Sequence, residues 1–556
     1  MRSLPSEVNA TQTMPRWQND AVGSERTAPS QLQSSDMRLR ALWALGCGLL
    51  SFACSSSDPV GTPTDPATDP PPNTPPSITP QVPSTGSLDV TLTADKGAAS
   101  NATVSFGLPF PQGVLTSEKN VTLKNGAGEA VPIAASVLAK WPGDGTIRSV
   151  LVAFKATLAA GANETWKIDY GTPTTSPDAG KIDPNPDGPV VATLAADFYA
   201  KSHVSGILLP VETNKRFSSY DVEIEKSFEA IDYSAFAANC DGGNNDRTYY
   251  DGPHAQYQRF LRTGDPKHLR IARTEAQWFR DNELTWYESR ALAVSKCQDP
   301  NWTDTVPLDW GALRRMLSQG MLDDYLVTGD PAAKEAVIAM GEAYRRNLPT
   351  LTASAKPVIE ITERNLGWPL MGIASYYALD SRNEVRDALA SLVTRTIAWQ
   401  DRGTSGGLEH DIVRPDPEEC GNGPKGGSPF MTSLVADGMM DYWLLTADPK
   451  VEPFLTKLAT WYEKSAVTSD KQAFRYLWNC QDNPYDDSST ADLNLLIVHV
   501  FGAAYAVTKD KHWLEFGDTI ADSGIEAIFA KRPKQWNQSA RTFGKYLGYR
   551  ALGATP

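Results

Sequence analysis

The stretch LRTGDPKHLRIA, residues 261–272, joins the end of one helical pattern to the start of the next. Asp followed by Pro is typical of a helix start, because the Asp side chain caps the first turn and Pro needs no N–H there. Four similar junctions follow: LVTGDPAAKEAV (326–337), YYALDSRNEVRDAL (376–389), LLTADPKVEPFL (444–455) and AVTKDKHWLEFG (506–517). Each junction predicts a tight helical hairpin.

The spacing of these junctions argues for a closed ring of hairpins. Their aspartates are Asp265, Asp330, Asp380, Asp448 and Asp510, at intervals of 65, 50, 68 and 62 residues. Open solenoids repeat more steadily, at roughly 34–47 residues. The first helix of each hairpin, together with a last helix at NQSARTFGKYLGYRALG (537–553), makes six inner helices. Residues 190–556 are therefore expected to form an all-α (α/α)6 toroid.

Residues 87–175 show a different pattern, in which polar and apolar positions alternate. The segments LDVTLTA, ATVSFGLPF, NVTLKN, IRSVLVAFKATL and ETWKIDYG are separated by the turn signals KNGAGE, WPGDGT and AAGAN. Such alternation is typical of half-buried strands. The chain is thus expected to be multidomain, with a small antiparallel β domain (a sandwich or small barrel) followed by the toroid.

Two motifs in this β domain resemble a known family. FGLPFPQGVL (106–115) and VPIAASVLAKWPGDGTIRSVLVAF (131–154) are similar to the N-terminal small-barrel domain of exo-rhamnogalacturonan-lyase-like proteins. The residues that match the family motifs are Phe106, Gly107, Pro109, Pro111, Gly113, Trp141, Pro142, Asp144 and Gly145, with Gly143 inserted in the second motif. The resemblance implies a carbohydrate-active context, although this family places its chemistry mainly outside the domain.

The N-terminal part reads as targeting sequence. MRLRALWALGCGLLSFAC (37–54) has a basic start and a short apolar run, and its end resembles a bacterial lipobox with Cys54 as the lipidated residue. Residues 1–36 are then an extension before the true start, and 37–53 is the signal peptide. Residues 54–86 form a Pro-rich tether. An outer-membrane lipoprotein of the cell envelope is expected, and the sequence does not indicate on which face of the membrane it is anchored. The alternative is an ordinary cleaved signal peptide without a lipid.

Composition excludes several classes of function. The chain carries 52 Lys and Arg against 66 Asp and Glu, a formal charge of −14, which argues against binding nucleic acid. The oxygen-rich segments CDGGNND and DNPYDDSS lack the spacing of a known calcium loop. We expect no metal, no cofactor, a monomer, a polysaccharide as the partner, and membrane contact through the lipid anchor only.

Four cysteines remain after Cys47 and Cys54 are assigned to the signal and anchor. Export favours their oxidation. Of the three possible pairings, adjacency favours Cys240–Cys297 and Cys420–Cys480; free thiols are the alternative.

The long loops at the rim opposite the tight turns are the expected site, because loops carry function on a rigid scaffold. They are rich in acids, amides and aromatics, which suits a glycan. These loops are ANCDGGNNDRTYYDGPHAQYQ (238–258), DTVPLDWGALR (304–314), ITERNLGWPLMG (361–372), ECGNGPKGGSPFMTS (419–433), NCQDNPYDDSSTADLN (479–494) and KRPKQWNQSARTFG (531–544).

Cleavage of a glycosidic bond by hydrolysis usually needs two carboxyl groups. Asp251 opens the first inner helix, and Asp232 lies 19 residues earlier. YYDGPHAQYQRFLRTGD (249–265) also resembles the first helix of bacterial endo-D-arabinanases, which are (α/α)6 hydrolases. That resemblance implies that Asp251 is the general acid and Asp232 the general base. The alternatives are a helix cap for Asp251 and a solvated loop acid for Asp232.

The remaining candidates are substrate-binding side chains, with capping, ion pairing or core packing as their alternatives. They are Asp246, Arg247, Tyr250, His254, Asp309, Trp310, Glu363, Arg364, Asn365, Trp368 and Trp536.

Three functions follow from these residues. The first is a lipid-anchored, endo-D-arabinanase-like glycoside hydrolase. The net negative charge of the chain favours this function, because that charge repels a polyanionic substrate and so suits a neutral glycan better. The second is a polysaccharide lyase of the rhamnogalacturonan or uronate type, with Tyr or His as base and Arg or Asn on the sugar carboxylate. The third is a non-catalytic glycan-binding lipoprotein.

Overall fold

The computed structural model describes residues 82–173, 179–236, 240, 243, 246–297, 308, 310–353, 358–410, 426–479, 490–528 and 532–552. The chain separates into two compact units, Met1–Asp69 and Pro70–Pro556, and every described residue belongs to the second. The predicted extension, the signal peptide, Cys54 and most of the tether therefore lie outside the described residues. So do Asp309, Cys420 and Cys480.

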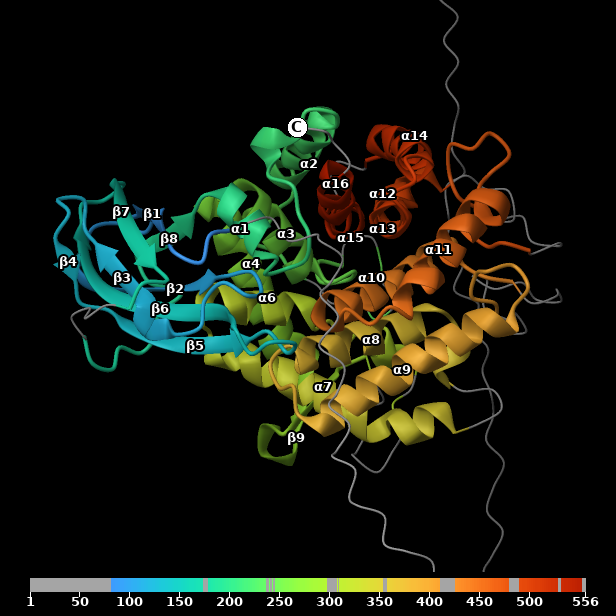
Figure 1. Ribbon diagram of the computed structural model, residues 1–556, viewed down its shortest axis with the longest axis horizontal. Coiled ribbons are helices and arrows are strands. Elements are labelled where there is room, and N and C mark those ends of the chain that lie inside the picture. Colours follow the sequence, from blue (N-terminus) through green and yellow to red (C-terminus); the bar gives the residue numbers. More distant parts are fainter. Residues whose placement is uncertain are drawn as a thin grey trace, which may run out of the picture. The chain divides into compact units, whose positions relative to one another are not determined.

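The first part of the described chain is a pair of antiparallel sheets (Figure 1). One sheet has the order β4-β3-β7-β1-β8 and the other the order β2-β6-β5. Alternate residues such as Val90 and Leu92 of β1 are buried between them, as the sequence alternation predicts. The strands are β1 (Gly86–Thr93), β2 (Ala99–Pro109), β3 (Val121–Lys124), β4 (Ala130–Val131), β5 (Ala134–Lys140), β6 (Ile147–Leu158), β7 (Asn163–Tyr170) and β8 (Val191–Leu194).

Strand β8 corrects the predicted boundary of the β domain, which ended at residue 175. It pairs antiparallel with β1, so that Leu194 lies opposite Val90. All four of its residues are buried. A short strand buried on both faces shows no alternation, which is why the sequence pattern did not reveal it.

The helices that follow form a closed ring, which confirms the predicted toroid. Within the described residues, each inner helical segment contacts the next, and the last two helices return to the first. The inner segments are α3 (Gly252–Thr263), α6 (Gln319–Thr328), α8 (Arg364–Tyr377), α10 (Pro429–Thr446), α12 (Asn494–Ile497) with α13 (His499–Thr508), and α15 (Pro533–Ala540) with α16 (Phe543–Ala551). The outer helices are α2 (Ser218–Glu229), α4 (Pro266–Trp278), α7 (Pro331–Thr352), α9 (Asn383–Arg402), α11 (Val451–Trp461) and α14 (His512–Glu526).

The five junction aspartates hold the tight turns as expected. Each accepts a hydrogen bond from the backbone N–H two residues later, and Asp265 and Asp330 are the N-caps of α4 and α7. The N···O distances are 2.9, 2.9, 3.2, 3.0 and 3.0 Å in chain order. The sequence motif therefore acts locally, as helix capping does.

Two further helices and one hairpin lie beside the ring helices and the two sheets in the described part. They are α1 (Ala196–Ser202), α5 (Trp310–Leu313) and a hairpin of β9 (Leu284–Tyr287) and β10 (Leu292–Ser295). The hairpin was not expected in a region whose pattern is otherwise helical.

The apolar character of one inner segment comes from its place in the ring. Residues Ala491–Thr508 have a mean hydropathy of 1.4 and the length of a membrane span, but 78% of them are buried in the protein. This stretch, which includes α12 and α13, packs against α10, α14 and α16. Burial in the ring therefore accounts for its composition.

The β domain packs on the end of the ring that carries the tight turns. Ser149 Oγ donates a 2.7 Å hydrogen bond to Leu326 O, and Tyr325 Oη donates to Leu138 O at 3.1 Å. Gly107 permits the close approach, since a Cβ there would lie 1.9 Å from Leu326 O. Strand β6 is thereby held against α6, next to Arg148.

Candidate functional site

Four side chains from segments far apart in the sequence lie near the starts of inner helices. We call Tyr249, Arg364, Asp492 and Lys534 the loop mouth. Arg364 Nη1 donates a 3.3 Å hydrogen bond to Tyr249 Oη, and Lys534 Nζ lies 5.6 Å from the centre of the Tyr249 ring. Asp492 lies in the short 3-10 turn (Ala491–Leu493) just before α12, and burial raises the pKa of its carboxyl while the nearby Lys534 charge opposes that rise. The mouth thus combines a phenol, two cations and a carboxyl with a raised pKa.

The turn that carries Tyr249 has a strained backbone. Tyr250 and Asp251 have φ values of 61° and 57°, the left-handed region, which costs roughly 1–2 kcal/mol per non-glycine residue. Asn537 Nδ2 donates to Arg247 O at 2.6 Å and to Tyr249 O at 2.9 Å. Strain of this kind persists where surrounding contacts enforce it, and it often occurs at functional sites.

The backbone carbonyl of Tyr250 also accepts a hydrogen bond from the last inner helix pair. Arg541 Nη1 donates to Tyr250 O at 2.8 Å. Gly252 follows the strained pair, and a Cβ there would lie 2.2 Å from Arg247 O. The turn is therefore closed by contacts on both sides, and it fixes the position of the Tyr249 backbone.

The two carboxyl groups of the predicted acid pair lie in different environments. Asp251 is 0% exposed and accepts backbone N–H groups from His254 and Gly320, each at 3.2 Å. These bonds cap α3 and tie it to α6, while burial raises the pKa of the carboxyl. Asp232 is exposed and accepts from Ser234 N at 2.9 Å and Ser234 Oγ at 2.6 Å; the serine hydroxyl lowers its pKa. One carboxyl group is enclosed and the other faces solvent.

Two other predicted contacts lie in buried ion pairs behind the mouth. Asp246 pairs with Arg315, and both side chains are fully buried. Arg247 lies 3.7 Å from Glu275 and is flanked by the rings of Tyr233 and Phe236 at 4.8 and 5.0 Å. These interactions support the mouth from behind rather than facing a ligand.

Two of the tryptophans predicted to stack on a sugar are buried in the core, so that prediction is wrong for them. Trp536 is 0% exposed, and its Nε1 donates to Ile224 O at 3.0 Å, so it belongs to the core between α2 and α15. Trp368 is also buried, with the Arg541 guanidinium 5.1 Å from its ring centre. A ring enclosed on both faces cannot stack on a sugar. Trp310 begins α5, but its side chain lies outside the described residues.

The remaining predicted contacts, at the start of α8 and just before α3, are buried in the protein. Glu363 is fully buried, accepts from Ser428 N at 2.9 Å and lies 3.1 Å from His410 Nδ1. Asn365 is buried beside it in the first turn of α8. Tyr250 is buried as well, with its ring 4.7 Å from that of Tyr249. Arg364 is buried as well, and its side chain bonds to Tyr249, which is also buried.

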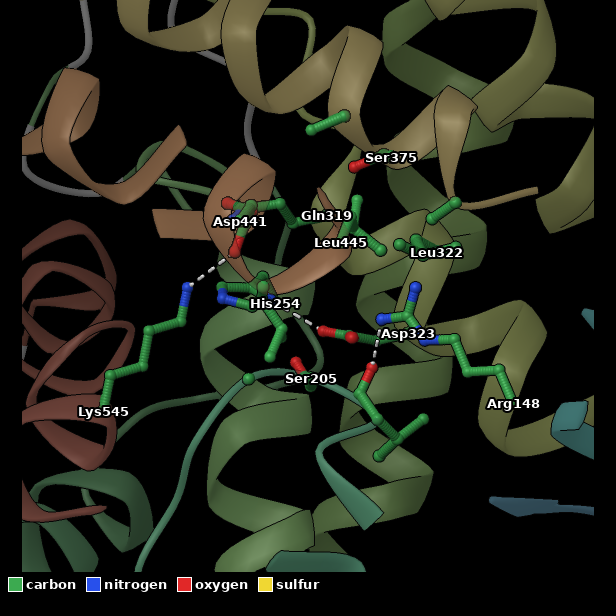
Figure 2. Close-up of a pocket in the computed structure, with 15 residues that line it drawn as sticks. Arg148, Ser205, His254, Gln319, Leu322, Asp323, Ser375, Asp441, Leu445 and Lys545 are labelled. Carbon is green, nitrogen blue, oxygen red and sulfur yellow. Dashed lines mark hydrogen bonds and ion pairs between the residues drawn. The ribbon is translucent and has the colours of Figure 1, made fainter. Parts of the chain in front are cut away.

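A second site, which we call the inner cavity, lies inside the ring toward the β domain (Figure 2). It leaves about 30 Å³ for the centres of water molecules. Figure 2 shows Arg148 and Lys545 on opposite sides, with His254, Gln319 and Asp323 between them. His254 Nδ1 lies 2.6 Å from Asp323 Oδ2, so the structure places this predicted residue in the inner cavity. The polar lining is Arg148, Ser205, His254, Gln319, Asp323, Ser375, Asp441 and Lys545.

The structure forms the predicted disulfide between Cys240 and Cys297. It joins the loop before α3 to the segment after β10 and so braces the first rim loop. The second predicted bond, Cys420–Cys480, lies outside the described residues. Among the described residues there is no group of three or more His, Cys, Asp or Glu side chains placed to hold a metal ion.

Sequence reasoning missed several of these residues although a signal was present. Asp323 and Asp441 are acids on inner helices that are mostly apolar and that each carry a second acid, Asp324 in QGMLDDYLVT and Asp437 in PFMTSLVADGMMDYWLLT. A charge on a helix buried all round marks a paired or functional group. Lys534 and Asp492 lie within the predicted rim loops, but nothing in the sequence indicates that Lys534 lies near Tyr249.

Comparisons with known proteins support the β domain. Residues 89–167 match the family described as "PcRGLX-like N-terminal RIFT barrel domain". This match confirms the resemblance carried by the two motifs of residues 106–154. No curated protein matches the chain significantly.

Solved structures similar to the ring belong to different kinds of enzyme. A polysaccharide lyase is 10% identical and covers 62% of this chain and 99% of its own, with a TM-score of 0.43. A glycosyl hydrolase of family 88 from Bacteroides vulgatus is 12% identical, covering 61% and 99%, with a TM-score of 0.41. A sugar epimerase from a ruminal bacterium is 13% identical, covering 49% and 72%, with a TM-score of 0.35. At these identities and scores they assign no reaction to this chain.

Proposed function

We propose that this protein is an enzyme that cleaves an extracellular polysaccharide at the loop mouth, on a sugar that carries a carboxylate. The observation that carries the proposal is the contact of Arg364 with the Tyr249 hydroxyl, with Lys534 close to the same ring. Two cations beside a proton acceptor match the needs of β-elimination, in which the sugar carboxylate must be neutralised. A substrate carboxylate at short range responds to the cations beside it more strongly than to distant charges, which salt screens.

In such a reaction the Tyr249 hydroxyl first releases its own proton to solvent, and the resulting phenolate oxygen takes the proton from the carbon next to the sugar carboxylate. The electron pair of that C–H bond forms a carbon–carbon double bond, and the bond to the leaving glycosidic oxygen breaks. Arg364 and Lys534 bind the carboxylate and stabilise the negative charge that develops on it. The leaving oxygen takes up a proton, for which Asp492 is the candidate donor, since burial raises the pKa of its carboxyl.

A second candidate is a paired-carboxylate hydrolase of a neutral glycan, similar to an endo-D-arabinanase. The raised pKa of Asp251 favours it, because a general acid must hold a proton at working pH. The strained backbone at Asp251 also fits a catalytic position. In this candidate Asp251 donates to the leaving oxygen and Asp232 activates water.

Product analysis on purified protein decides between the candidates. The panel contains arabinan, arabinogalactan and rhamnogalacturonan. β-Elimination yields unsaturated ends that absorb in the near ultraviolet, whereas hydrolysis yields new reducing ends without that absorbance. A protein that retains a glycan and releases neither product is a binding lipoprotein, and that outcome overturns both enzymatic proposals.

A further inference from the structure

The inner cavity is separate from the loop mouth and is partly built by the β domain. Helices α3, α6, α8, α10 and α16 contribute its walls, and β6 contributes Arg148. The loop at Val204 to Gly206 also lines it. Because Ser149 fixes β6 to the last turn of α6, Arg148 is held in place at this wall. The cavity is thus a built feature of the joined β domain and ring.

Arg148 presents hydrogen-bond donors that no described residue accepts. Its Nη2 donates to Val204 O at 2.8 Å, while Nε and Nη1 have no partner. The residue is 4% exposed and its guanidinium lies 4.7 Å from the Trp141 ring centre. Burial lowers its pKa to about 10, so the group remains protonated at neutral pH. A buried charged donor without a partner is costly, which argues for a bound group in the cavity.

The facing walls supply acceptors. Asp441 accepts from Gln319 Nε2 at 2.7 Å and lies 3.5 Å from Lys545 Nζ, yet its side chain is still 22% exposed. Asp323 is bound to His254 Nδ1, and His254 Nε2 has no partner. Neither carboxylate closes on Arg148, since two of its nitrogens have no partner. The cavity therefore has hydrogen-bond donors of Arg148 on one side and carboxylate acceptors on the other.

The charge of this lining selects the ligand class. A small anion would satisfy Arg148 but would meet Asp323 and Asp441, and a cation would meet Arg148 and Lys545. A neutral hydroxyl group both accepts and donates, so it suits both walls. We propose that the inner cavity binds a neutral vicinal diol, the polar edge of a small polyol or monosaccharide. The hydroxyl oxygens accept hydrogen bonds from Arg148, and the hydroxyl groups donate hydrogen bonds to the Asp441 carboxylate.

Calorimetric titration of the whole exported chain tests this site without any measurement of catalysis, so its result is independent of the proposed function. The probes are glycerol and D-arabinose as neutral diols, and acetate as an anion of similar size. Ser375→Val fills the cavity wall, and Arg148→Gln removes the charged donors. The matched control is Ser433→Val, the same change at a buried serine of α10 whose Oγ bonds to Phe430 O instead.

We expect saturable binding of at least one diol. Ser375→Val and Arg148→Gln should each weaken this binding about tenfold or more, and Ser433→Val should leave it unchanged. A tenfold loss of affinity corresponds to about 1.4 kcal/mol, the scale of one or two lost hydrogen bonds. If Arg148→Gln fails to fold, Ser375→Val decides the question alone. Diol binding that is absent in the unmodified protein, or equal in all variants, overturns the proposal and leaves water as the occupant. Binding of acetate without a diol overturns the ligand class.

Discussion

Arg364 Nη1 and Tyr249 Oη are joined by a 3.3 Å hydrogen bond that links the start of the third inner helix to the loop before the first. This contact spans 115 residues of sequence. It brings a cation to a phenol oxygen at the rim where the predicted site was expected. The loop mouth depends on this relationship, and the first prediction tests it.

Replacing Tyr249 by Phe removes the hydroxyl that Arg364 contacts and keeps the ring. We expect activity on a uronate-bearing polysaccharide to fall by about 10²–10⁴-fold, the contribution of a general base, with little change in the melting temperature. Tyr325→Phe is the control, because it removes a hydroxyl that bonds to Leu138 O at the other end of the ring. Full activity in Tyr249→Phe would rule out a role of this oxygen in proton transfer.

Replacing Asp251 separates capping from catalysis. Asp251→Asn keeps a side-chain acceptor and suits the left-handed backbone, so we expect the protein to fold. If Asp251 only caps α3, this variant retains most of its activity, whereas the hydrolase candidate predicts a loss of two orders of magnitude or more. Asp251→Ala loses the bonds to both helix starts and should lower the free energy of unfolding by about 1–2 kcal/mol.

Glu275 should make stability depend on pH. Burial raises its pKa to about 8, with Arg247 opposing and Asp251 adding to the shift. The folded protein then holds a proton that the unfolded chain releases above about pH 4.3. Stability due to this group is therefore complete below that pH, and it falls as pH rises to about 8. Denaturant unfolding of Glu275→Gln should show a weaker decline across this range; an unchanged slope would contradict the assignment.

The disulfide should stabilise the rim loop before α3. Cys240 and Cys297 are 57 residues apart, a loop length at which a disulfide contributes about 2–4 kcal/mol. Cys240→Ser, Cys297→Ser and the double variant should each lose the same stability in urea unfolding. If reduction of the unmodified protein causes a larger loss than these variants, other cysteines contribute as well.

The lipid anchor on Cys54 is a prediction from the targeting sequence. Cells fed a labelled fatty acid should incorporate label into the unmodified protein and not into Cys54→Ser, which should leave the membrane fraction. Cys47→Ser, within the same apolar segment, is the control and should still be labelled. Label in Cys54→Ser would show that another residue is modified.

The architecture was predictable because its signals are local. The junction aspartates bond to N–H groups two residues away, so a motif of a few letters is enough to place a tight turn. Alternation in residues 87–175 predicts strands because neighbouring side chains on a strand face opposite sides. Strand β8 was not predicted, because its four residues are all buried and therefore show no alternation of polar and apolar positions.

The site was decided by tertiary structure. Asp251 looks the same in sequence whether it caps a helix or donates a proton; its two backbone partners, one of them Gly320 on another helix, are set by the packing of α3 on α6. Trp536 lies in a rim loop by sequence, yet the packing of α2 encloses it. Tyr249, Arg364 and Lys534 meet only because the ring closes. Sequence alone determined the hairpins and strands through short-range hydrogen bonding, whereas long-range burial decided which charges pair, which rings are enclosed and which groups face a ligand.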